Sequence, residues 1–235
     1  MGKFEYDSEL LARFPDVQAG VLFCQGISNQ STPVGLKEKY FIEQGAVLKQ
    51  IGETPLSELE SLAAWRSAFR QFGVNPTKYR SAVEALLRRL TKKGDIPSIN
   101  TLVDIGNLVS IRYQIPVAVF DVGRTGGTIL VRFATGDEQF TPLFETADEH
   151  PEPDEVIFID GNGLVAARRW CWRQSDQSAS KLDTQSVMIV TEAHHPGAEK
   201  SVRQAVADLE LLVAEYLGGE FASGIANAQH PAVAG

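Results

Sequence analysis

The sequence predicts an α+β protein. Three amphipathic segments between residues 55 and 113 have the apolar spacing of helices, whereas the segments that follow Pro116 are dominated by short strand-like runs. Helices grouped before strands, instead of alternating with them, are typical of α+β domains. Because we find no internal repeat and no linker, we expect a single domain over residues 1–218. The alanine- and glycine-rich residues 219–235 are expected to form a flexible tail.

The helices are expected in the first half of the chain. AGVLFCQGI at 19–27 indicates a buried strand, and NQSTPVG at 29–35 indicates a loop. Thr54 followed by Pro55 predicts the start of a helix that ends at Gly73. A second helix is expected between Asn75 and Gly94, and a third over residues 99–113.

Strands dominate the second half. The expected strands are VAVFDV, TILVRFA, EQFTPLF, EVIFID, LVAARRWCWR and SVMIVTEA, and a helix follows at 199–217. GRTGG, between the first two strands, predicts a hairpin turn, and GNG predicts a hairpin between EVIFID and LVAARRWCWR.

Composition excludes several classes of protein. The apolar runs are too short to span a membrane, and the N-terminus has acidic residues where an export signal is apolar. Cys24 and Cys171 lack metal-type spacing, which favours reduced thiols in a cytoplasmic protein. We therefore expect a cytoplasmic protein with no metal, no cofactor and no membrane partner.

Three familiar catalytic patterns are missing or incomplete. GRTGGT at 123–128 does not open a helix, so it lacks the geometry of a phosphate loop. His194 and His195 have no third ligand at a suitable spacing, which favours a solvated turn over a metal site. No nucleophile elbow or reactive-cysteine signature is present, so nucleophilic catalysis has no support.

Positive charge is concentrated in residues 65–93. This segment carries eight Lys or Arg and one acid, in a chain whose formal net charge is −8. Arg80, Glu84 and Arg88 have the i,i+4 spacing of a surface ion-pair ladder, which is the simpler interpretation. Because the ladder leaves most of the basic residues unneutralised, we favour a surface that attracts a polyanion.

The segment ARRWCWR at 167–173 is open to two interpretations. As a strand it would place Arg168, Trp170 and Trp172 on one face. Arginines beside aromatic rings are suited to holding phosphate and stacking an unpaired base. Tryptophans that fill the core, with arginines at its rim, are the alternative, and the segment taken alone favours it.

The order of these motifs resembles a known family. WRSAFRQFG, NPTKYRSAVEALLRRL, IPSINTLVDIGNLVSIRYQIPVAVFD, ILVRFATGDEQFTPL and ARRWCWR are similar to the editing domain of the phenylalanyl-tRNA synthetase beta chain. The similarity is closer to free-standing proteins that consist of this B-three/B-four tRNA-binding domain, and it covers residues 55–193. It implies a three-layer α+β fold containing an unusual β-sandwich. It also implies hydrolysis of mischarged tRNA, chiefly tyrosine on the phenylalanine acceptor.

The resemblance also implies site residues. The family's asparagine falls on Asn107, and its tyrosine-reading glutamate falls on Val190, two residues before Glu192 on the same strand face. We expect Asn107 and Glu192 to be catalytic. Two departures stand out: Ala118 replaces a histidine, and RRWCWR replaces a glycine-rich segment.

The expected partner is the acceptor end of a mischarged aminoacyl-tRNA, and not DNA. The residues expected to contact it, gathered around one cleft, are Trp65, Arg66, Arg80, Arg168 and Trp170. The chain has no room for an adenylate-forming core or an anticodon module, which favours a trans-acting deacylase over a complete synthetase. A noncatalytic RNA-binding or regulatory module of the same fold is the alternative, supported by Ala118. A pocket for an amino acid or nucleoside is a third, and it predicts scattered arginines.

Overall fold

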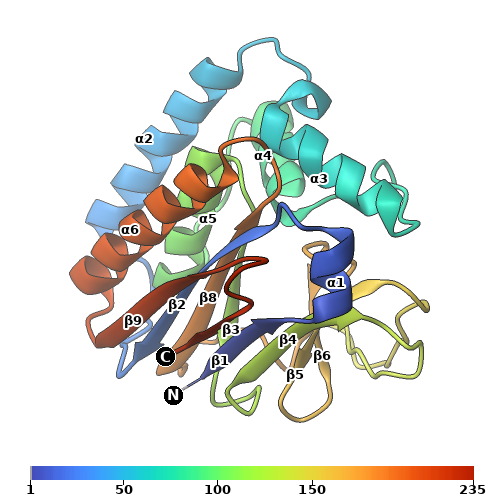
Figure 1. Cartoon of the computed structure of the whole chain (residues 1–235). Coiled ribbons are helices and arrows are strands. Elements are labelled where there is room, and N and C mark those ends of the chain that lie inside the picture. The colour runs from blue at the N-terminus through green and yellow to red at the C-terminus, as the bar shows by residue number, and fades with distance from the viewer. Residues whose placement is uncertain (1) are drawn as a thin grey trace.

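The computed structural model describes residues 2–235 and has three layers (Figure 1). The helices are α1 (Ser8–Arg13), α2 (Val34–Ile51), the 3-10 turn η1 (Leu56–Glu58), α3 (Glu60–Gln71), α4 (Ala82–Lys93), α5 (Thr101–Tyr113) and α6 (Ala198–Tyr216). Within residues 2–235, no helix has the length and apolar character needed to cross a membrane.

The strands form two sheets. A six-stranded sheet has the order β10 (Ala232–Ala234), β1 (Lys3–Tyr6), β4 (Thr128–Phe133), β5 (Val156–Asp160), β6 (Val165–Arg168) and β7 (Arg173–Gln174). A four-stranded sheet has the order β3 (Val117–Asp121), β8 (Ser186–Ala193), β2 (Gln18–Gln25) and β9 (Glu220–Ala226). All pairs are antiparallel except β1 with β4.

Strand β8 separates two hydrophobic cores. Its side chains alternate, so that Val187 and Ile189 pack toward α2, α4, α5 and α6, whereas Met188 and Val190 face the six-stranded sheet. The second core lies between the two sheets and is joined by Leu10 and Leu11 of α1 and by the aromatic side chains Trp65 and Phe69 of α3. The predicted α+β class, with its three layers and its β-sandwich, is therefore confirmed.

Three helix predictions need correction. The loop expected around residues 29–35 leads directly into α2, a helix with no counterpart in the prediction. Phe41 and Ile42 of α2 are exposed, so apolar residues occur on both sides of the helix and obscure its periodicity. Helix α3 follows the separate turn η1, and α4 begins only after Ser81, whose hydroxyl accepts a hydrogen bond from the Glu84 amide.

Three strand predictions also differ from the structure. The GRTGG turn is not a hairpin, because β3 and β4 belong to different sheets. EQFTPLF forms only isolated bridges. The strand expected through residue 173 ends at Arg168, because Arg169 and Trp170 have φ angles of 45° and 59° and turn the chain. The hairpin across GNG is confirmed as β5 and β6.

Residues 219–235, expected to form a flexible tail, contain the two strands β9 and β10. Strand β9 pairs with β2 along seven residues, and β10 pairs with β1. The two ends of the described chain meet, since the Gly235 amide donates to the Gly2 carbonyl at 3.0 Å (Figure 1). Backbone pairing holds this segment, and alanine-rich side chains carry little sequence signal of such pairing.

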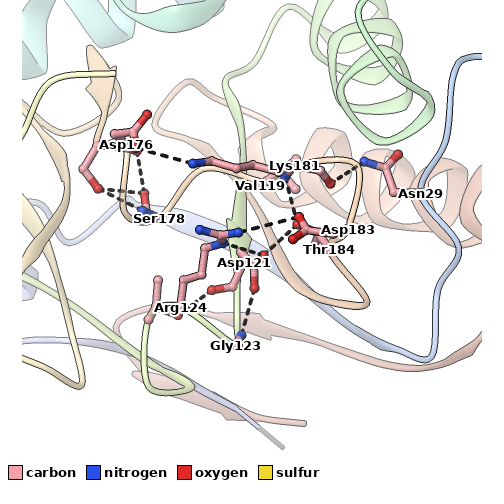
Figure 2. A network of polar contacts seen from close by, with 12 residues as sticks. Asn29, Val119, Asp121, Gly123, Arg124, Asp176, Ser178, Lys181, Asp183 and Thr184 are labelled. Carbon is pink, nitrogen blue, oxygen red and sulfur yellow. Dashed lines mark hydrogen bonds and ion pairs between the residues drawn. The ribbon is translucent and has the colours of Figure 1, made fainter. Parts of the chain in front are cut away.

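A polar network fixes the connection that leads from β7 to β8 (Figure 2). The Asp121 carboxylate at the end of β3 accepts hydrogen bonds from the Thr184 hydroxyl at 2.6 Å and the Gly123 amide at 2.9 Å. The side-chain amide of Asn29 donates to the Lys181 carbonyl at 2.9 Å. At the start of the connection, Gln174 donates to the Val119 carbonyl at 2.7 Å. The network thus ties both sheets together beside the cavity described next.

Candidate functional site

A cavity of about 70 Å³ lies between the two sheets; we call it the sandwich cavity. It is lined by Val117, Ala118, Val190 and Glu192 of the four-stranded sheet, by Phe158, Ala167 and the segment 170–174, and by Ala82 and Pro116. Most of these side chains are apolar. Glu192 is the acidic group among them. Side chains alternate along β8, so Glu192 points into the sandwich on the same side as Met188 and Val190.

Two neutral donors hold the Glu192 carboxylate. Its Oε1 atom accepts hydrogen bonds from Trp170 Nε1 at 3.0 Å and from the Tyr6 hydroxyl. Burial raises the pKa of Glu192 to about 7, although these hydrogen bonds act in the opposite direction. A carboxyl group that titrates near neutral pH is suited to taking up and returning a proton.

Tyr6 and Cys171, two ionisable groups close to Glu192, are neutral. Burial, reinforced by the Glu192 charge, raises the pKa of the Tyr6 hydroxyl and of the Cys171 thiol well above their ordinary values. A protonated thiol is a poor nucleophile, so Cys171 adds no nucleophile to the cavity. At Ala118, where the resemblance leads one to expect a histidine, only a methyl group lines the cavity.

The raised pKa of Glu192 predicts how stability depends on pH. The folded protein holds this proton more tightly than the unfolded chain, so stability falls as the pH rises from about 4.5 to about 7. We expect the Glu192→Gln variant, which carries no charge at this position, to gain about 3 kcal/mol over the wild type across that interval. Urea unfolding of both proteins at pH 4.5 and pH 8 measures this difference in the free energy of unfolding. The prediction is contradicted if the free energy of unfolding depends on pH equally in both proteins.

The basic segment forms a groove beside the cavity. The basic groove has a volume of about 420 Å³ and is lined by Lys78, Arg80, Ala85, Arg88, Arg89, Lys92, Lys93 and Trp172. Trp172 lines the sandwich cavity as well. A second hollow, of about 410 Å³, adjoins the groove and shares Arg80, Arg88 and Lys92 with it.

Most of the positive charge of the groove is unneutralised. Glu84 pairs with Arg66 at 2.8 Å and with Arg80 at 3.7 Å, so the predicted ladder forms only in part and does not include Arg88. Arg89 pairs with Asp95 at 3.5 Å. Within residues 2–235, no ion pair is formed by Lys78, Arg88, Lys92 or Lys93.

Three of the residues predicted to contact RNA are interior. Trp65 and Trp170 are 1% and 0% exposed, and their rings pack together with centroids 5.3 Å apart. Arg168 is 3% exposed, and its guanidinium is bound by Glu155 at 2.9 Å and Glu149 at 2.6 Å. These three predictions are corrected. Of the predicted set, Arg80 lines both the basic groove and the second hollow, Arg66 lines the second hollow, and Arg168 lines neither.

The structure does not bring the predicted catalytic pair together. Asn107 lies on α5 beside Tyr40 of α2, in the helical layer. Glu192 points to the opposite side of the four-stranded sheet, into the sandwich cavity. Asn107 therefore does not line this cavity, and Glu192 alone of the pair is positioned there.

The solvated turn that the sequence favours for the two histidines is not found at His194, whereas His195 is half-buried. The ring of His194 packs edge-on against Trp65 and Trp170, with centroids 4.4 Å and 4.7 Å away. Burial lowers the pKa of His194 to about 3, so the ring is neutral. His195 contacts the Ser201 hydroxyl at 3.2 Å. Among residues 2–235, no group of three or more His, Cys, Asp or Glu side chains has the arrangement of a metal site.

The sequence contains no indication of Tyr6, and the strand pattern placed Trp172 wrongly. Tyr6 lies 186 residues from its partner Glu192, in a short strand without a motif, so no local signal points to it. Trp172 was placed by the strand pattern on the same face as Trp170. The left-handed backbone at Arg169 and Trp170 separates the two, so that Trp170 lies inside and Trp172 lies at the groove.

The fold and the site together define an α+β domain with a buried carboxylate between its sheets and a basic groove next to it. The model of the B3/4 domain family matches residues 64–211, and the chain belongs to this family.

Its relatives include much larger proteins. The phenylalanine–tRNA ligase beta subunit of Geobacter metallireducens is 28% identical over an alignment of 163 positions, which covers 59% of this chain and 20% of the relative. That of Photorhabdus laumondii is 30% identical over 87 residues, 37% of this chain and 11% of the relative. A solved N-terminal fragment of the phenylalanyl-tRNA synthetase beta subunit from Pyrococcus horikoshii has a TM-score of 0.49 and 13% identity, covering 93% of this chain and 49% of that one. The chain thus spans a fifth or less of the length of these two ligase subunits.

Proposed function

We propose that the chain binds tRNA and hydrolyses the ester of mischarged aminoacyl-tRNA in trans. The observation that carries this proposal is the meeting of the basic groove and the sandwich cavity at Trp172. The groove suits a phosphate backbone, and the cavity that shares Trp172 with it contains a carboxyl group with a pKa of about 7. Membership of the B3/4 family and the tRNA ligase names of the relatives support tRNA as the partner.

The chemistry requires one proton acceptor and a bound water. An ester between an amino acid and a ribose is already activated, so no protein nucleophile is needed. In the proposed reaction the Glu192 carboxylate takes a proton from water, and the water oxygen forms a bond to the ester carbonyl carbon. The bond to the ribose oxygen then breaks, and the proton passes from Glu192 to that oxygen. Tyr6 and Trp170 orient the carboxylate through Oε1.

A panel of mischarged tRNAs tests the proposal. Wild-type protein is incubated with tRNAs that carry noncognate amino acids, and release of free amino acid is measured against the spontaneous rate. We expect accelerated release from at least one member and none from the correctly charged counterpart. If every member decays at its spontaneous rate, the hydrolase is ruled out for the amino acids tested.

A noncatalytic RNA-binding module is the second candidate, and Ala118 favours it. Ala118 lies on β3, the strand next to β8, and its methyl group supplies no polar side chain beside Glu192. This candidate predicts tight tRNA binding without release of any amino acid, so filter binding on the same panel distinguishes it from the first.

A further inference from the structure

Trp172 occupies a special position between groove and cavity. The left-handed backbone at Arg169 and Trp170 ends β6 and turns Trp172 toward the basic groove, where its ring is half-buried. Positive φ angles are uncommon at residues other than glycine, and two such residues in succession favour a functional role for the turn. The turn brings an aromatic ring to the border between the basic groove and the sandwich cavity.

The neighbours of Trp172 hold its ring in place. The Arg169 guanidinium lies 4.6 Å from the Trp172 ring centroid and 3.9 Å from that of Tyr79. The Tyr79 and Trp172 rings meet edge-on at 5.0 Å, and Arg173 lies 5.1 Å from the Trp172 ring. Arg169 is itself anchored, since its amide donates to Glu155 at 2.9 Å and its guanidinium lies 3.5 Å from the same carboxylate.

The combination matches what single-stranded nucleic acid requires. Proteins that bind unpaired strands use a positive groove along the backbone and aromatic rings on which bases stack. Here the cations line the groove and the aromatic ring lies where the groove meets the cavity. A base stacked on this ring leaves its own ribose, and any ester on it, next to the cavity.

We propose that Trp172, braced by Arg169 and Tyr79, stacks the unpaired 3′-terminal base of an RNA whose phosphates lie in the basic groove. This inference rests on the proposed function and adds to it the group that recognises the RNA end. Trp172, and not the interior Trp170 or Trp65, is then the tryptophan that contacts RNA.

Two forms of one uncharged tRNA test the inference, one with its complete 3′ end and one without the terminal nucleotide. We expect the wild type to bind the complete tRNA about tenfold more tightly, in the range of one base stacked on an aromatic ring. Trp172→Ala removes this difference by weakening binding of the complete tRNA only. Trp172→Phe retains most of it, and Phe41→Ala, at an exposed aromatic on α2, changes nothing.

The outcomes separate the two proposals. If the wild type binds both tRNAs but discriminates between them no better than Trp172→Ala, the stacking role is overturned and tRNA binding stands. If the wild type binds neither tRNA, both proposals are overturned. Should Trp172→Ala fail to fold, Trp172→Leu provides the comparison, because it keeps apolar volume at the cavity and lacks an aromatic face.

Discussion

Replacing Glu192 with glutamine is expected to slow amino acid release from mischarged tRNA by at least about 100-fold, the lower end of what a general base contributes. Glutamine has nearly the same shape and keeps an oxygen that accepts from Tyr6 and Trp170. It cannot take a proton from water at neutral pH. Single-turnover measurements with the protein in excess isolate the chemical step from binding.

The affinity of Glu192→Gln for tRNA should equal that of the wild type, because the carboxylate lies in the cavity and outside the groove. Glu199→Gln, at an exposed position of α6, is the matched control and should hydrolyse normally. The wild-type rate should rise as the pH passes through about 7, where Glu192 loses its proton, and should level off above it. An undiminished rate in Glu192→Gln would remove Glu192 from the reaction.

Reversing two charges in the basic groove is expected to abolish most tRNA binding. In the double variant Arg88→Glu with Lys92→Glu, two cations that pair with no acid in residues 2–235 become anions. We expect the affinity to fall by at least about 100-fold at low salt. The slope of the logarithm of affinity against the logarithm of salt concentration should become shallower by about 1.5 to 2.

A matched control separates the groove from the total charge. Lys37→Glu with Lys200→Glu changes the net charge equally at exposed positions of α2 and α6, outside the groove. Fluorescence anisotropy over a series of salt concentrations measures both double variants. Equal losses in the two would mean that net charge, and not the groove, governs binding.

Local signals in the sequence predicted part of the fold. The β5–β6 hairpin follows from its GNG turn, and α5 and α6 follow from apolar periodicity. Helix α2 was not predicted, because it exposes large apolar side chains that obscure its periodicity. Strands β9 and β10 were not predicted, because they are held by backbone pairing with β2 and β1. Amino-acid composition does not reveal such pairing. The assignment of β3 and β4 to different sheets is likewise a long-range property.

The candidate site was predictable to a smaller extent. Glu192 lies in the cavity, and the density of basic residues correctly indicated a charged surface. Spacing does not distinguish an interior arginine from an exposed one, and Arg168 is interior because Glu149 and Glu155 neutralise it. Asn107 was carried over from a motif, and the four-stranded sheet separates it from Glu192.

The most direct test asks whether the basic groove and the sandwich cavity bind the same RNA 3′ end. It is a crystal structure of the protein with a short RNA hairpin that ends in a 3′-aminoacyl-amide, a linkage that resists hydrolysis. We predict phosphates along Arg88 and Lys92, the terminal base on Trp172, and the amide carbonyl within one water molecule of the Glu192 carboxylate. A 3′ end bound elsewhere, with the groove and the cavity both unoccupied, would contradict the proposed function.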